Sequence, residues 1–177
     1  MKRIILLAVA AMMATVSLQA QEERKNEVAI AYGVGSNTDI VSSIYKGIFT
    51  GKQSGYWGPL SVECFHHLGG GKLGLGAVLV LGGCKWGDSD KAKTTFYTAM
   101  PAVKYNWKNK KMLSMYSKLA AGITIADDSG SSDSSTDSSF NFHLTAFGIE
   151  VGSSIRGFAE AGWGEQGILL AGLRYKF

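Results

Sequence analysis

Large apolar residues alternate with small or polar residues in eight stretches of this chain, and this pattern constrains the fold more than any other feature. In the first stretch, Val28, Ile30 and Tyr32 share one face while small and charged residues occupy the other. A period of two residues is that of a β-strand, whose side chains point alternately to opposite faces. The pattern predicts an all-β chain with strands over 26–35, 60–68, 73–81, 95–107, 113–125, 140–151, 155–163 and 169–177.

The connections between these stretches are sorted by length. The long ones cover 36–54, 82–93 and 126–139, the short ones cover 69–71, 108–110 and 152–153, and 164–166 is intermediate. With an even number of strands, the short turns and both termini lie on one side, and the long connections lie on the other. This sorting is typical of membrane barrels and has no counterpart in a soluble sandwich. We therefore predict an eight-stranded antiparallel up-and-down transmembrane β-barrel.

Two of the predicted strands contain local irregularities. The alternation that begins at Phe140 breaks near Gly148, which predicts a β-bulge. Pro101 lies inside another strand and cannot donate a hydrogen bond to the ladder of a closed barrel, so we expect a second bulge there.

The N-terminal segment is predicted to be a targeting signal. Met1-Lys2-Arg3 is followed by an apolar run of 13 residues, Ile4 to Val16, and by the small residue Ala20. This pattern indicates a secretory signal peptide cleaved after Ala20, because 13 residues are short for the alternative, an uncleaved anchor helix. We divide the chain into a signal peptide, 1–20, a short N-terminal segment, 21–26, and a barrel domain, 27–177.

The charge balance argues against nucleic-acid binding, and the positions of the cysteines argue against a disulfide. The full chain has 18 Lys and Arg against 14 Asp and Glu, and removal of Lys2 and Arg3 leaves 16 cations, too even a balance for nucleic-acid binding. The predicted strands separate Cys64 from Cys84 by most of a strand length, which is too far for a disulfide.

The two faces of the predicted strands differ in charge. One face of nearly every strand is free of charges and carries the aromatic residues, as expected for a wall that contacts lipid. The other face combines small residues with a few charges, which suits the narrow interior of an eight-stranded barrel. The predicted interior network contains Glu63, Lys104, Lys118, Arg156, Glu160 and Arg174. The predicted interfacial aromatic girdle contains Tyr56, Trp57, Tyr105, Trp107 and Trp163.

The last residues resemble the C-terminal insertion signal of Gram-negative outer-membrane barrels. Phe177 is the terminal aromatic residue, Tyr175 is the second, and Gly172 lies five residues before the end; Leu170 departs from the usual polar residue. The architecture over 27–177 is similar to small outer-membrane proteins of the OmpA, OmpX and opacity type. Residues 100–107 resemble a strand of uncharacterised proteins with an outer membrane protein β-barrel domain. The resemblance implies a location in the outer membrane, with its lipids and the barrel insertion machinery as partners.

The predicted interior charges allow two interpretations. Arg156 and Arg174 should lie opposite each other and need a carboxylate between them, so that the interior is a plug of ion pairs. The alternative is a narrow anion-preferring pore, which is suggested by four predicted cations against two carboxylates.

The remaining polar residues give weak evidence for chemistry. His66, His67 and His143 raise the possibility of a lipid A-modifying enzyme, but no acidic partner is evident beside them. The acidic stretch 127–137 lacks the spacing of an EF-hand and is predicted to be a mobile, solvated loop. Apolar residues in 36–50 have helical spacing and predict a short amphipathic helix on the barrel rim. We predict no catalytic, cofactor-binding or metal-binding residues.

These observations favour a non-enzymatic outer-membrane barrel with a structural or surface-interaction role through its external loops. We expect a monomer that contacts lipids, is inserted by the barrel machinery, and meets an unidentified extracellular ligand if it has one. The lipid A-modifying enzyme, the anion-preferring pore and a soluble exported ligand-binding barrel are the alternatives.

Overall fold

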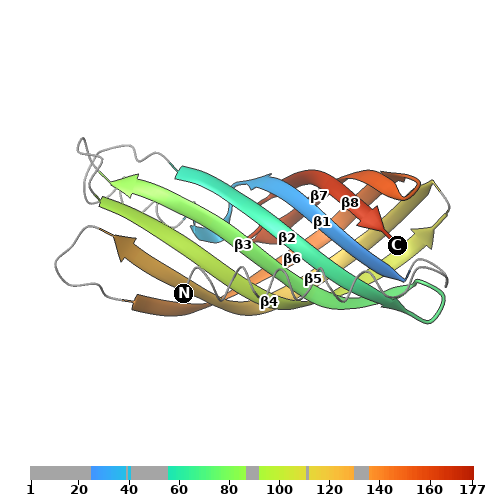
Figure 1. Ribbon diagram of the computed structural model, residues 1–177, viewed down its shortest axis with the longest axis horizontal. Helices are drawn as coiled ribbons and strands as arrows, with labels where there is room; N and C mark the ends of the chain where they lie inside the picture. The colour runs from blue at the N-terminus through green and yellow to red at the C-terminus, as the bar shows by residue number, and fades with distance from the viewer. Residues whose placement is uncertain (1–24, 39, 41–55, 87–91, 111, 130–135) are drawn as a thin grey trace.

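The computed structural model describes residues 25–38, 40, 56–86, 92–110, 112–129 and 136–177. Within them, eight strands form one closed antiparallel barrel, which confirms the predicted fold class (Figure 1). The strands are β1 (Asn26–Val34), β2 (Tyr56–Leu68), β3 (Leu73–Trp86), β4 (Ala92–Asn109), β5 (Leu113–Ser129), β6 (Thr136–Gly152), β7 (Ile155–Gly164) and β8 (Leu169–Lys176). The predicted signal peptide, 1–20, lies outside the described residues and stays a prediction.

The barrel closes where the first strand meets the last. β1 pairs with β8 from Glu27 opposite Lys176 to Val34 opposite Leu169. Beyond this ladder, Asn26 and Phe177 exchange two backbone hydrogen bonds of 3.0 and 2.9 Å. Closure satisfies the backbone groups that an open sheet would leave at its edges, as a wall surrounded by lipid requires.

The two ends of the barrel are named here by their connections. The β2–β3, β4–β5 and β6–β7 connections, the start of β1 and the end of β8 lie at one end, called the turn end. The β1–β2, β3–β4, β5–β6 and β7–β8 connections lie at the other, called the loop end. Figure 1 shows β3 to β6 reaching further toward the loop end than β1, β7 and β8.

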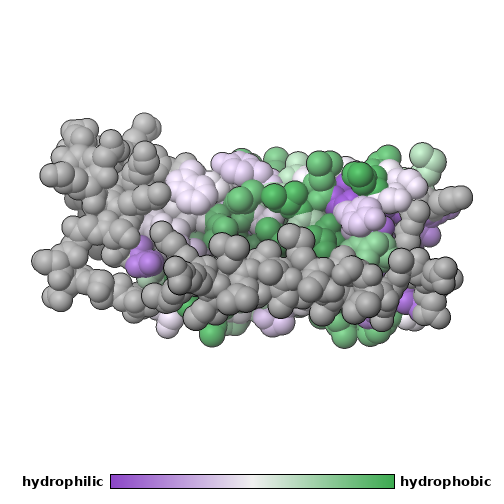
Figure 2. Space-filling model, in the orientation of Figure 1, coloured by the Kyte–Doolittle hydropathy of each residue, from purple (hydrophilic) through white to green (hydrophobic). Residues whose placement is uncertain are grey.

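The burial pattern places apolar side chains outside and charges inside. Ile30, Leu119 and Leu173 point outward and are more than half exposed, whereas Lys104 and Arg174 are buried in the interior. In Figure 2 hydrophobic side chains gather along the barrel wall, with hydrophilic groups toward its ends. This polarity is the reverse of that in a soluble protein and matches a barrel whose outer wall contacts lipid.

Among the described residues, no helix has the length and apolar character needed to cross a membrane.

Two of the predicted long loops are mostly strand, so the predicted loops 82–93 and 126–139 are wrong. β3 continues to Trp86, which pairs with Ala92 of β4, and Asp127 of β5 pairs with Thr136 of β6. These polar extensions lack the one-sided apolar pattern because neither face has to bury against lipid or a core. Sequence alternation therefore could not detect them, although their backbones continue the ladder.

The bulge predicted near Gly148 is confirmed two residues earlier. Against β7 the register shifts between Thr145 and Phe147, so Ala146 is the extra residue, and both Ala146 and Phe147 are exposed. The insertion inverts the alternation, so that Glu150 points toward the interior.

The bulge predicted at Pro101 is wrong. Pro101 pairs with Ala77 of β3, and the β4–β5 register is the same on both sides of the proline, from Ala99 opposite Ile123 to Ala102 opposite Ala120. The pairing with β5 is interrupted at Met100 and Pro101 without an inserted residue, and the two backbones come close at Gly122. A Cβ atom on Gly122 would lie 2.0 Å from the Ala99 carbonyl oxygen.

The predicted helix over 36–50 is described only at its start. The Ile40 N–H donates to the Ser36 carbonyl oxygen at 2.9 Å, which closes one helical turn. Residues 41–55 lie outside the described residues.

The two cysteines lie at different heights on neighbouring strands. Cys64 is opposite Ala77, and Cys84 is opposite Tyr56. Ala77 and Cys84 are separated along β3 by about 23 Å at the usual rise per residue. This separation agrees with the expectation that no disulfide joins the cysteines.

A tight contact between two strands gives a test of lumen packing. A Cβ atom on Gly148 would lie 2.6 Å from the ring of Tyr116, whereas one on Gly157 would meet nothing within 4 Å. We expect Gly148→Ala to lower the free energy of unfolding by about 1–3 kcal/mol through overpacking. Urea unfolding in lipid vesicles, followed by tryptophan fluorescence, measures the loss. The matched control Gly157→Ala should leave stability nearly unchanged, and equal losses in both variants would contradict the packing argument.

Candidate functional site

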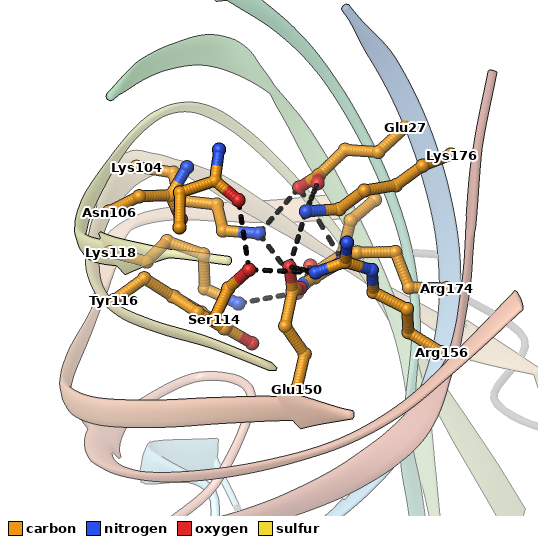
Figure 3. A network of polar contacts seen from close by, with 12 residues as sticks. Glu27, Lys104, Asn106, Ser114, Tyr116, Lys118, Glu150, Arg156, Arg174 and Lys176 are labelled. Atoms are coloured by element: carbon orange, nitrogen blue, oxygen red, sulfur yellow. Dashed lines mark hydrogen bonds and ion pairs between the residues drawn. The ribbon is translucent and has the colours of Figure 1, made fainter. Parts of the chain in front are cut away.

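The candidate site is the lumen, and Glu150 lies near its centre (Figure 3). Glu150 projects from β6, and its carboxylate contacts cations from three other strands. Its oxygens lie 3.3 Å from Lys104 Nζ, 3.1 Å from Arg156 Nη1 and 2.5 Å from Arg174 Nη1, and Lys176 Nζ also contacts it. One carboxylate thus ties β4, β7 and β8 to β6.

Arg174 is the most connected cation in the lumen. It lies 2.8 Å from Glu63 and 3.4 Å from Glu27 in addition to its contact with Glu150. Its guanidinium also stacks over the ring of Phe158, 4.3 Å from the ring centroid. The planar, permanently charged guanidinium can serve several carboxylates at once, which a lysine ammonium does less well.

Lys118 joins a second group of residues that lies nearer the loop end of the lumen. Its Nζ contacts Glu63 and lies 2.8 Å from Glu160. Glu160 also accepts hydrogen bonds from the Tyr116 hydroxyl and the Thr145 hydroxyl, both at 2.6 Å. The Glu63 carboxylate, shared by Lys118 and Arg174, connects this group to the ion pairs around Glu150.

The structure places all six residues of the predicted interior network inside the lumen, each less than 7% exposed: Glu63, Lys104, Lys118, Arg156, Glu160 and Arg174. Arg156 and Arg174 are direct partners across β7 and β8, as expected from the turn between them. Glu150 supplies the carboxylate that this arrangement requires.

The predicted interior network left out several residues that the structure places in the lumen, for different reasons. Lys176 lies on the inward face that the alternation identifies, and Glu27 lies on the charged face of its strand, so alternation places both side chains inside although the predicted network did not include them. Glu150 was hidden because the extra residue Ala146 inverts the parity of β6 before it. Glu165 and Gln166 were missed because they follow a strand and were assigned to a turn.

The interior charges balance, so the excess of cations proposed from the sequence is wrong. Among the described residues, the interior holds five buried carboxylates and five buried cations. The carboxylates are Glu27, Glu63, Glu150, Glu160 and Glu165, and the cations are Lys104, Lys118, Arg156, Arg174 and Lys176.

The β7–β8 connection folds into the lumen and covers the network from the loop end. Glu165 and Gln166 are both buried, and the Gln166 amide donates to Glu63 at 2.8 Å. Gly164 and Gly167 flank the pair with φ of 133° and 109°, values that side-chain-bearing residues rarely adopt. These two glycines allow the chain to turn inward and out again within four residues.

Glu165 differs from the other buried carboxylates because its partners are neutral. The Thr38 hydroxyl lies 2.8 Å from both carboxylate oxygens, and the Asn141 amide donates to one of them at 2.8 Å. No cation of the described chain lies within ion-pair distance of it. Burial therefore raises the pKa of Glu165 above its ordinary value, although hydrogen bonds from Thr38 and Asn141 oppose the shift.

Two of the three histidines lie in the lumen, and one of them has an acidic partner. His67 Nε2 lies 2.9 Å from Glu27, so the expectation that no histidine has an acidic neighbour is wrong. His66 is exposed and pairs with Asn26.

The third histidine is held in one tautomer by its surroundings. The Gln166 N–H donates to His143 Nδ1 at 3.3 Å, which assigns the ring proton to Nε2. Nε2 then donates to the Thr145 hydroxyl at 3.1 Å, and that hydroxyl donates to Glu160. The neighbouring groups thus satisfy His143 fully. In the described part of the chain, no cluster of three or more His, Cys, Asp or Glu residues could hold a metal ion.

The predicted girdle and C-terminal residues face outward or close the wall. Trp57, Tyr105, Trp107 and Trp163 are exposed on the outer surface, and the side chain of Tyr56 lies outside the described residues. Tyr175 is exposed and stacks with Phe177, with ring centroids 5.6 Å apart. A Cβ atom on Gly172 would lie 2.2 Å from the Ile30 carbonyl oxygen, so this position needs glycine where β8 meets β1.

Comparisons with known proteins give similarity at the level of strand architecture. No protein-family model and no curated protein matches the sequence. A similar solved structure is Ail, the attachment invasion locus protein of Yersinia pestis, with 11% identity and a TM-score of 0.48. A second structure is Ail in complex with the heparin analogue sucrose octasulfate, with 13% identity and a TM-score of 0.49. Each alignment covers 86% of this chain and 96% of Ail.

The different surroundings of Glu150 and Glu165 give a paired test. Glu150→Gln leaves cations from three strands without their shared carboxylate, and we expect a loss of about 3–5 kcal/mol in the free energy of unfolding. Glu165→Gln keeps a hydrogen-bonding side chain where no described cation needs a counterion, and it should keep or raise stability at neutral pH. Denaturant titrations in lipid vesicles measure both variants.

The pH dependence of the same pair separates charge from packing. Because the folded pKa of Glu165 is raised, the stability due to its protonated form is present below the unfolded pKa and is lost as the pH rises through the folded pKa. The advantage of Glu165→Gln over the native chain should therefore grow with increasing pH. A stability difference between Glu165→Gln and the native chain that does not change with pH would contradict the raised pKa of Glu165.

Proposed function

We propose that this chain is a non-enzymatic integral barrel of the outer membrane, monomeric, with a closed lumen, and that it acts at the cell surface through its loop end. The polarity of the wall carries the proposal. Outward-facing apolar residues cover the barrel on every strand, while ten charged side chains of the described residues are buried inside. Such a wall is stable in lipid and would aggregate in water.

The loop end supports a surface-interaction role. β3 to β6 continue beyond the ends of β1 and β7, so a four-stranded sheet stands above the rest of the barrel (Figure 1). Its outer part is polar and lies on the side of the longer connections. We infer that this sheet projects from the membrane on the cell surface.

The projecting sheet ends in an open edge on β6. β6 pairs with β5 up to Thr136, but within the described residues it pairs with β7 only from His143 onward. The Phe142 carbonyl accepts a hydrogen bond from the Glu165 N–H, so the backbone of Phe142 faces away from β5. Alternation gives Phe140 and Ser138 the same orientation. An open edge of this kind can pair with an extended segment of another protein.

A conducting pore is less compatible with the lumen. The charges that suggested anion preference are balanced, and the side chains of Glu150, Arg174 and Gln166 cross the interior. Planar-bilayer recordings should remain at baseline, and anion-selective conductance steps would favour the pore.

An enzyme acting on lipid A is also less compatible. His67 and His143 point into the lumen and are buried, where a lipid substrate on the outer wall cannot reach them. Identical lipid A mass spectra with and without the gene are expected.

Site-specific labelling tests the proposed location and orientation. Ser138 lies on the projecting sheet and Ser153 in the β6–β7 turn, and both are exposed. In a background carrying Cys64→Ser and Cys84→Ser, we expect Ser138→Cys to react with a membrane-impermeant maleimide on intact cells. The matched variant Ser153→Cys should react only after the outer membrane is permeabilised. Equal labelling of both positions on intact cells, or labelling of Ser153→Cys alone, would contradict the proposal.

A further inference from the structure

Three lysines gather at the turn end of the barrel and form what is called here the turn-end lysine cluster: Lys72, Lys108 and Lys110. Hydrogen bonds hold the turns that carry them together. The Asn106 N–H donates to the Lys72 carbonyl at 2.8 Å, and the Asn106 amide donates to the Gly71 carbonyl at 2.7 Å. The β2–β3 turn is thereby fixed against the end of β4, and all three lysines are exposed.

A β-bulge contributes to the exposure of Lys108. Lys104 and Asn106 point into the lumen, so regular alternation would direct Lys108 inward as well. The β4–β5 register shifts between Asn106 and Lys108, and Trp107 and Lys108 are both exposed as a result. The bulge keeps a further cation out of a lumen whose charges are already balanced.

The turn-end lysine cluster has no acidic counterpart in the described part of the chain. None of its three ammonium groups lies within ion-pair distance of a described carboxylate, and the described glutamates are all buried in the lumen. The described aspartates, Asp127, Asp128 and Asp137, belong to the loop end. In the described part of the turn end, the cluster therefore presents exposed positive charge that is suited to an anionic partner.

The cluster lies beside lipid-facing residues. Lys108 follows Trp107, which is half exposed on the outer wall and contacts Phe147 with ring centroids 5.7 Å apart. Lys72 precedes Leu73, another outward-facing residue. Aromatic residues at the ends of membrane strands mark the depth of the headgroups, and lysine side chains next to them reach the same depth.

We propose that the turn-end lysine cluster is a docking surface for the phosphate groups of anionic phospholipids in the membrane leaflet at the turn end. This inference rests on the proposed function, because it requires the barrel to be inserted in a bilayer. Lysine ammonium groups attract phosphate as mobile point charges, which suits fluid headgroups rather than one fixed ligand geometry. The position beside Trp107 favours lipid over a soluble polyanion, which would need no contact with the lipid-facing wall.

Quenching of single tryptophans by brominated lipids tests the proposal. One protein keeps only Trp107, through Trp57→Phe, Trp86→Phe and Trp163→Phe, and a matched protein keeps only Trp163 at the loop end. Each is reconstituted in phosphatidylcholine vesicles that contain phosphatidylglycerol, with either lipid brominated. We expect phosphatidylglycerol to be preferred about fivefold next to Trp107 at low salt, the factor that corresponds to one surface lysine.

The preference should fall to about one with Lys72→Gln, Lys108→Gln and Lys110→Gln combined, and it should weaken at high salt. Trp163 should show no preference. A preference at Trp107 that survives the triple substitution, or an equal preference at both tryptophans, would overturn the inference. The inference would also be overturned if Trp107 shows no preference for phosphatidylglycerol while purified peptidoglycan retains the native protein but not the triple variant. If brominated phosphatidylcholine quenches neither tryptophan, the barrel is not in the bilayer, and the proposed function fails together with the inference.

Discussion

Closure of the backbone ladder between β1 and β8 is the constraint on which the rest of the structure depends. Once the ladder closes, the two faces of every strand lie in different environments: one lines a narrow interior and the other faces outward. An interior enclosed by eight strands is just wide enough for side chains. The side chains of the inward face must therefore fill the lumen themselves. Glycine is needed where a large side chain leaves no room for a Cβ atom, as at Gly148 beside the ring of Tyr116.

Filling the lumen with charges requires that they be paired. A buried charge without a partner costs several kcal/mol, on the order of 3–5 when one member of a pair is removed. Glu150 and Arg174 meet this requirement by each contacting partners from several strands, so the ion pairs also fix the relative positions of those strands. Glu165 is the exception, since its carboxylate is buried among hydroxyl and amide groups. Its position at the loop end, where the β7–β8 connection enters the lumen, places a carboxylate with neutral partners next to the projecting sheet.

The strands and the inward charges could be predicted from the sequence because a period of two residues reports directly on the two faces. Ile30 and Tyr32, or Lys104 and Lys118, are assigned to their faces by parity alone. Parity fails where a residue is inserted, so Ala146 hid Glu150. It also carries no information where both faces are polar, so the pairing of Trp86 with Ala92 and of Asp127 with Thr136 was missed. The inward course of Glu165 and Gln166 depends on the backbone conformations of Gly164 and Gly167, which no side-chain pattern records.

The central claim is that the closed, ion-paired barrel exists as a stable unit in the outer membrane. Gel mobility of the detergent-extracted protein with and without heating tests it most directly, because a closed barrel stays folded and compact in the detergent until it is boiled. The structure predicts a fast-migrating band in the unheated outer-membrane fraction and a shift to the mobility of the unfolded chain after heating. A single band that does not shift, or recovery of the protein in the periplasmic fraction without detergent, would contradict the account.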